Sequence, residues 1–149
     1  MKKVIFALVC VFTLFATALK ADDDRVIAVN KLPQAAQTLL KTHFAKAKVT
    51  IAKVESDFLD KTYDVTFADG NSIEFDKNGK WKEIKCPQGS VPAAVIPSFI
   101  KDYVKGNYPN ATVKQLEYDK RDKDYDVKLS NGWELKFDRN GNLIDLDND

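Results

Sequence analysis

Apolar and polar residues alternate along two stretches of the chain that closely resemble each other. In Tyr63–Phe75 and in Tyr125–Phe137, two alternating runs are separated by a turn dipeptide, Asp69-Gly70 or Asn131-Gly132. Alternation predicts strands with one buried face, and Asp-Gly and Asn-Gly are preferred dipeptides of tight hairpin turns. The sequence therefore predicts the same β-hairpin twice, 62 positions apart.

Each hairpin is extended by further strands. A second turn, Asn78-Gly79 or Asn140-Gly141, follows each hairpin and leads into another short apolar run. A β-rich run also precedes each hairpin, so every copy is expected to contain four strands. The additional strands are predicted at Val49–Glu55, Trp81–Cys86, Val113–Tyr118 and Leu143–Leu146.

In the segment before each set of strands, apolar residues recur at the spacing of one helix face. The helices are predicted from Pro33 to Phe44 and from Pro97 to about Gly106, each opened by a proline, which favours the first turn of a helix. Residues 22–30 are expected to be a loosely ordered lead-in. The predicted fold class is α+β: two tandem helix-plus-four-strand repeats, about residues 31–86 and 91–147, form one curved antiparallel sheet with both helices on one face.

The first 21 residues have the pattern of a secretory signal peptide. Lys2 and Lys3 precede an apolar run from Val4 to Phe15, and small residues follow up to Ala21. The run is too short to span a membrane. We therefore expect residues 22–149 to form the mature domain, in the periplasm or secreted.

Charge excludes one class of partner. Without residues 1–21, which contain three lysines and no acidic residue, the formal net charge falls from +1 to −2. The charges are spread along the chain, so nothing indicates nucleic-acid binding. Cys86 is then the only cysteine. We expect it to be buried at the end of a strand, with a reactive or intermolecular thiol as the alternative.

The duplicated unit resembles a known family. The residues that carry the resemblance are the Leu32-Pro33 and Ile96-Pro97 helix starts, the Tyr-Asp-Val strands and the Phe-Asp-x-Asn-Gly turns. They are similar to those of the PepSY-like secreted proteins of Bacteroidetes, over residues 32–146. That family resembles the β-lactamase inhibitor proteins, which implies a fold of two tandem helix-plus-four-strand units with a concave sheet. The inhibitors carry disulfides, whereas the expected mature chain cannot form one internally.

No residues suggest an enzyme. His43 is the only histidine, and it lies near the end of a predicted helix, where a surface position is the expected one. No nucleophile, base and orienting acid occur in a recognisable pattern, and no glycine-rich phosphate loop is present. We therefore expect no catalytic activity and no required cofactor.

Calcium is the one metal for which the sequence contains candidate ligands. The two Asn-Gly turns contain Asp76 with Asn78 and Asp138 with Asn140, a partial match to a calcium loop that lacks one end of the ligand set in each copy. Aspartate in such turns more often accepts backbone hydrogen bonds. A structural role is the favoured interpretation, and a weak calcium site is the alternative.

The tryptophans offer a second candidate chemistry. Trp81 and Trp133 begin strands near loop tips, where an indole can anchor an interface, although core placement is the favoured interpretation.

Two helices cover one side of a sheet, so the opposite side is expected to be open. We predict a non-enzymatic binding module for an unknown envelope or secreted protein, acting by interaction or inhibition, with a calcium- or small-ligand-responsive sensor as the alternative. The predicted binding residues are Asp64, Thr66, Asp69, Glu74, Trp81, Asp126, Lys128, Trp133, Glu134 and Lys136.

Overall fold

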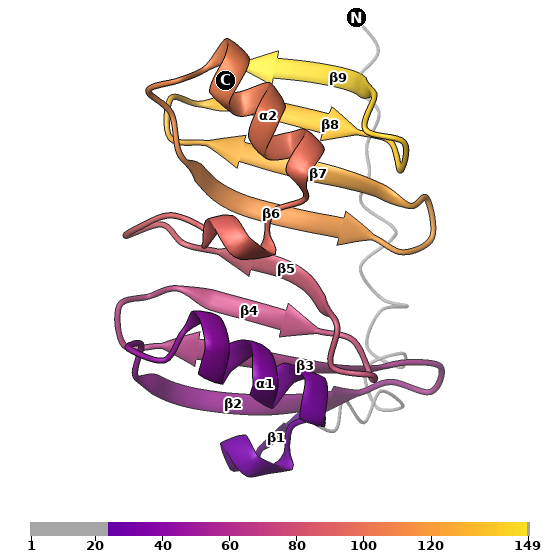
Figure 1. Ribbon diagram of the computed structural model, residues 1–149. Coiled ribbons are helices and arrows are strands. Elements are labelled where there is room, and N and C mark those ends of the chain that lie inside the picture. Colours follow the sequence, from indigo (N-terminus) through magenta and orange to yellow (C-terminus); the bar gives the residue numbers. More distant parts are fainter. Residues whose placement is uncertain (1–23, 149) are drawn as a thin grey trace, which may run out of the picture.

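The computed structural model describes residues 24–148, so the expected signal peptide, residues 1–21, lies outside the described residues. These contain nine strands and two α-helices (Figure 1). The helices are α1 (Gln34–His43) and α2 (Ser98–Asn107), and two short 3₁₀ turns are η1 (Val29–Lys31) and η2 (Ala93–Val95). The strands are β1 (Arg25–Val26), β2 (Val49–Ser56), β3 (Lys61–Phe67), β4 (Ser72–Phe75), β5 (Trp81–Lys85), β6 (Val113–Asp119), β7 (Asp124–Leu129), β8 (Trp133–Phe137) and β9 (Leu143–Asn148).

All of these strands belong to one open sheet, in which spatial order equals chain order from β1 to β9. Every neighbouring pair is antiparallel. The two halves of the chain join through β5 and β6, where Ile84 lies opposite Leu116. The predicted α+β class with a single antiparallel sheet is therefore confirmed.

The prediction of a loosely ordered lead-in before the first helix is wrong. Arg25 and Val26 pair with Val54 and Lys53 of β2, and the Ile27 N–H donates to the Ala52 carbonyl at 2.9 Å. The edge of β2 offers unpaired backbone groups that an adjacent extended segment can satisfy. The sheet thus has a ninth strand, and a strand of two residues is too short to be predicted from sequence alternation.

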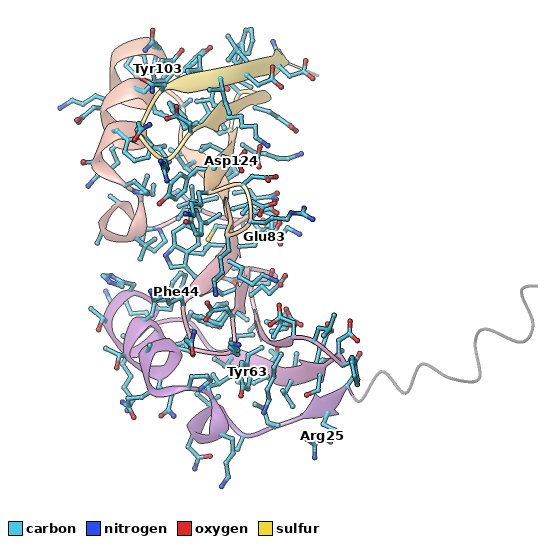
Figure 2. The ribbon with its side chains drawn as sticks, turned by 90° about the vertical axis from the view of Figure 1, so that its right-hand side faces the viewer. Arg25, Phe44, Tyr63, Glu83, Tyr103 and Asp124 are labelled. Carbon is cyan, nitrogen blue, oxygen red and sulfur yellow. The ribbon has the colours of Figure 1, made fainter. Side chains whose placement is uncertain are left out.

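The helices begin and end within about one residue of the predicted positions. Pro33 and Pro97 occupy the N-cap positions, with φ of −53° and −52°. Proline lacks the N–H that the first turn of a helix leaves unpaired, so these positions favour a helix start. Both helices lie on the same side of the sheet (Figures 1 and 2).

The core lies between the helices and the sheet. Leu40, Ile100 and Val104 are buried on the helices, and Phe75 and Phe137 are fully buried on the strands beneath them. The ring of Tyr103 packs edge-on against Phe137, with centroids 5.3 Å apart. One face of the alternating strands is buried, as the alternation predicts, and it includes Val65, Phe67, Phe75, Val127, Leu129 and Phe137.

Two predicted turns also hold the helices in place. Gly79 and Gly141 have φ of +81° and +86°, a region that only glycine enters without strain. A Cβ at Gly79 would lie 2.8 Å from the Cβ of Pro33, at the start of α1, and a Cβ at Gly141 would lie 3.0 Å from the ring of Phe99 on α2. The absence of a side chain therefore lets each turn contact its helix.

Candidate interaction surface on the open sheet face

The side of the sheet that faces away from the helices is polar. On each strand the buried residues alternate with residues that point to this side, which we call the open face (Figure 2). Seven of the predicted binding residues lie here: Asp64, Thr66, Glu74, Asp126, Lys128, Glu134 and Lys136. Carboxylates outnumber ammonium groups nine to four among the side chains that line the two shallow hollows of this face.

The two tryptophans lie elsewhere. Both are partly buried against the core, on the side that the helices cover. Trp81 packs against Tyr125 with ring centroids 6.5 Å apart, and Trp133 packs against Tyr108 at 5.8 Å. These contacts correspond to the favoured core interpretation, so the tryptophans are not part of the open face. Asp69 lies in the β3–β4 turn, where its carboxylate accepts the Asn71 N–H at 3.0 Å.

Five carboxylates lie directly opposite one another on consecutive strands of the open face. We call this set the carboxylate row, and it consists of Asp64 on β3, Glu74 on β4, Glu83 on β5, Glu117 on β6 and Asp126 on β7. Lys53 on β2 and Lys136 on β8 are opposite its two ends. At the usual interstrand spacing the row is about 19 Å long.

The adjacent row of the same face has a different composition. From β3 to β8 it contains Thr66, Ser72, Lys85, Gln115, Lys128 and Glu134. Acidic, basic and neutral residues are mixed there, and Lys128 forms a salt bridge with Glu134. The concentration of acidic residues is therefore a property of one row and not of the face as a whole.

Nearby cations neutralise the row unevenly. The Lys82 ammonium lies 2.6 Å from the Glu74 carboxylate, and the Lys85 ammonium lies 2.9 Å from the Glu83 carboxylate. The Gln115 amide also donates to Glu83 at 2.7 Å. Within residues 24–148, no lysine or arginine forms a salt bridge with Asp64 or Glu117.

Burial and mutual repulsion affect the acidity of the row. Partial burial, followed by the charges of Glu55 and Glu74, raises the pKa of Asp64 from 3.8 to about 6. Partial burial and the charges of Glu83, Asp126 and Glu74 also raise the pKa of Glu117. Partial burial raises the pKa of Asp126 as well, although the nearby Lys136 opposes that change. The folded protein thus holds these negative charges at a cost in free energy.

One further carboxylate on this face is almost completely buried. Asp124 is only 7% exposed, and it lies two residues before Asp126 on β7. Its Oδ2 atom is 3.3 Å from the Lys136 ammonium, which also lies 3.6 Å from Asp126. The Oδ1 atom of Asp124 has no hydrogen-bond partner. A buried acceptor without a donor is costly, so this oxygen marks a place where a donor would be stabilising.

The hairpin between β2 and β3 carries a feature that the sequence analysis missed. Phe58 and Leu59, at its tip, are 96% and 87% exposed. At the corresponding tip between β6 and β7, 62 positions later, the chain has Lys120 and Arg121. The sequence signal was the pair of adjacent apolar residues in a segment that should contain only turn residues. Exposed aromatic and aliphatic residues of this size are typical of interface anchors.

Asp60, the residue after the apolar tip, and part of the carboxylate row line the same hollow. This hollow has a volume of about 620 Å³. Glu74, Glu83 and Glu117 of the row line it, together with Asp60 from the β2–β3 tip and Arg121 from the β6–β7 tip. Charged side chains dominate its lining, whereas pockets for small organic ligands are mostly apolar.

The four calcium candidates lie in the two Asn-Gly turns. Asp76 accepts the N–H groups of Asn78 and Lys80 at 2.8 and 3.0 Å. Asp138 accepts those of Asn140 and Asn142 at 2.8 and 2.9 Å, and the hydrogen bonds from Asn142 are the main reason that its pKa is lowered. Within the described part of the chain, no group of three His, Cys, Asp or Glu side chains is arranged to hold a metal ion.

The single histidine and the single described cysteine, His43 and Cys86, line the same pocket at one end of α1. His43 is the last residue of α1, and Cys86 follows β5. Cys86 is 1% exposed, which confirms the predicted burial, and this burial is the main reason that the pKa of its thiol is raised. A buried thiol with a raised pKa is a poor nucleophile.

Between Asp24 and Asn148, no helix is long and apolar enough to cross a bilayer.

The chain matches a protein family and several crystal structures. Residues 61–145 match the family described as "Putative beta-lactamase-inhibitor-like, PepSY-like". A putative periplasmic protein of the DUF2874 family from Bacteroides vulgatus is 55% identical, with a TM-score of 0.82, and the match covers 87% of this chain and 100% of that one. A "putative calcium-regulated periplasmic protein" from Bacteroides thetaiotaomicron is 56% identical, with the same coverage and TM-score. A putative periplasmic protein of unknown function from B. vulgatus is 39% identical, with a TM-score of 0.77, covering 84% of this chain and 99% of that one. No curated protein matches the sequence.

Proposed function

Because this periplasmic chain belongs to the PepSY-like, β-lactamase-inhibitor-like family, we propose that it is a non-enzymatic module that binds or inhibits another envelope or secreted protein. The proposed binding surface is the open face together with the β2–β3 tip. The observation that carries the proposal is the almost complete exposure of Phe58 and Leu59, which directly precede Asp60 in the chain; Asp60 lines a hollow together with charged side chains of that face. An apolar anchor beside a polar surface is the usual anatomy of a protein interface.

We also interpret the two halves, about residues 31–86 and 91–147, as tandem repeats. The order of elements supports this interpretation, because α1 precedes β2–β5 and α2 precedes β6–β9. Gly79 and Gly141 make equivalent contacts with the two helices. Under this interpretation the halves share a framework and differ at the hairpin tips, where binding residues have most freedom to vary.

The test uses the protein recovered from the periplasm as bait for the envelope fraction. Replacing Phe58→Ser and Leu59→Ser should abolish capture of its partner, and so should the pair Glu74→Lys and Lys128→Glu. Reversal of Lys136 is left out, because it would remove the counter-charge from the buried Asp124.

A matched control changes charges on the helix side. Lys41 on α1 and Lys101 on α2 are exposed, and the pair Lys41→Glu and Lys101→Glu should leave capture unchanged. Loss of capture with this control pair, and retention with the tip and face variants, would place the binding site on the helices and refute the proposal.

A calcium-responsive function is the second candidate. Its support is the relative described as a putative calcium-regulated periplasmic protein, together with the carboxylates in the two Asn-Gly turns. Calorimetric titration with CaCl₂ tests it. A submicromolar site that disappears in Asp76→Ala or Asp138→Ala would favour a sensor, whereas binding weaker than millimolar would exclude one.

A further inference from the structure

We propose that the carboxylate row binds a polypeptide segment rich in lysine or arginine. This inference rests on the proposed protein-binding function and adds the chemistry of the partner. The row presents five carboxylates in one line across β3–β7 of an uncovered sheet face. Positive charges that follow this line would complement it, whereas the mixed row beside it has no net preference.

Among the described residues, two members of the row lack a salt bridge, whereas Glu83, at its centre, is paired with Lys85. Glu117 lies opposite Glu83 on one side and Asp126 on the other, so its nearest cross-strand neighbours are both acidic. In the described part of the chain, Glu117 and Asp64 form no salt bridge. A cationic side chain bound there would relieve the repulsion that like charges on neighbouring strands create.

Asp124 provides an independent observation at the same place. Its unpartnered Oδ1 atom belongs to a side chain that is more than nine-tenths buried. Strand alternation places Asp124 on the same face as Asp126, and both contact the ammonium of Lys136. This oxygen is buried, so a bound partner would act on Asp124 through its charge and not through a direct hydrogen bond.

The geometry fits a polypeptide better than a metal ion. Calcium requires six to eight oxygens at about 2.4 Å from one point. Carboxylates set on successive strands about 4.8 Å apart form a line instead of such a cage. Lysines three or four positions apart on a helix are separated by about 5–6 Å, which is close to the spacing of the row.

The experiment is a titration of the ¹⁵N-labelled protein, recovered from the periplasm, with a defined probe. The probe is a synthetic peptide of about 16 residues with lysine at every third or fourth position, which places the lysines on one helical face. A matched peptide carries glutamate at those positions. We expect the lysine peptide to shift amide resonances of β3–β7. Its binding should be at least tenfold weaker at about 0.5 M salt than at about 0.05 M salt. The glutamate peptide should shift no resonances.

Neutral variants of the row identify the site. The triple variant Asp64→Asn, Glu117→Gln and Asp126→Asn should lower the affinity for the lysine peptide by about tenfold or more. These substitutions remove raised-pKa carboxylates, so they should stabilise the fold, and loss of binding would not reflect unfolding. Asp102→Asn, an exposed change on α2, is the control and should bind as the unmodified protein does.

Three results would overturn the inference: no binding at low salt, equal binding by the triple variant, or resonance shifts confined to the helices. Shifts of the row by CaCl₂ at about 1 mM, together with no shifts by the peptide, would assign the row to a metal instead. Failure here is distinguishable from failure of the proposed function. If the triple variant still captures the envelope partner and the Phe58 and Leu59 variant does not, the protein binds a partner that is not cationic.

Discussion

Asp64→Asn should stabilise the protein at neutral pH and have a much smaller effect on its stability at about pH 4. Partial burial and the charges of Glu55 and Glu74 raise the pKa of Asp64 from 3.8 to about 6. A raised carboxyl pKa means that the folded state favours the protonated form, so the charged form destabilises folding. This penalty is about a fifth of its full size at pH 4 and complete above about pH 7, and asparagine removes it.

The size of the effect follows from the pKa shift. About two units at 1.36 kcal/mol each give an upper limit of about 3 kcal/mol. Asp64 is only half-buried, so solvent screens much of the interaction, and we expect a gain of about 1 kcal/mol in the free energy of unfolding. With a typical urea dependence of about 2 kcal/mol per molar, the unfolding midpoint should rise by about 0.5 M.

Urea titrations at about pH 7.5 and pH 4 measure this difference, and NMR titration of the Asp64 carboxyl carbon measures the pKa directly. Asp102→Asn, at an exposed position on α2, serves as the control and should shift neither midpoint. Destabilisation by Asp64→Asn at pH 7.5 would refute the reasoning. So would a gain of equal size at both pH values, because the effect would then not arise from the charge.

Three further predictions concern the framework. Phe137→Ala should cost about 3–5 kcal/mol in urea unfolding, because the ring is fully buried; a loss below about 1 kcal/mol would contradict this position in the core. Gly79→Ala should destabilise the protein more than Gly70→Ala, since both glycines have positive φ but only a Cβ at Gly79 would contact Pro33. Equal decreases in the melting temperature would show that the start of α1 moves aside at no cost in stability. Cys86 should react with iodoacetamide far more slowly in the folded protein than in urea, and equal rates would contradict its burial.

Most of the framework could be predicted from local patterns. The period-two alternation identified the hairpin strands, and the two prolines identified the helix starts within about one residue. β1 was not predictable in this way. It has two residues, and it exists because the edge of β2 accepts it, which is a tertiary effect.

The open face could be predicted only in part. Alternation alone places Asp64, Glu74 and Asp126 on one side of the sheet, and hairpin turns set the register within each hairpin. The pairing of Glu83 with Glu117 is different, because β5 and β6 are joined by a long segment that includes α2. No turn determines that register, so the alignment of five carboxylates was visible only in the structure. The Asp124 oxygen was hidden for the same reason, since its burial depends on packing between strands.

The carboxylate row is difficult to explain as an ordinary solvated surface. A sheet face in water needs only polar residues, and the mixed row shows that this fold accommodates threonine, serine, glutamine and paired charges at equivalent positions. Acidic residues directly opposite one another each cost stability, and a lysine or threonine at Glu117 alone would relieve two such contacts. If the row binds a cationic segment, as proposed, binding converts this repulsion into attraction. The neutral variants therefore separate the two explanations: a solvated row predicts greater stability with no loss of binding, and a binding row predicts greater stability at the expense of affinity.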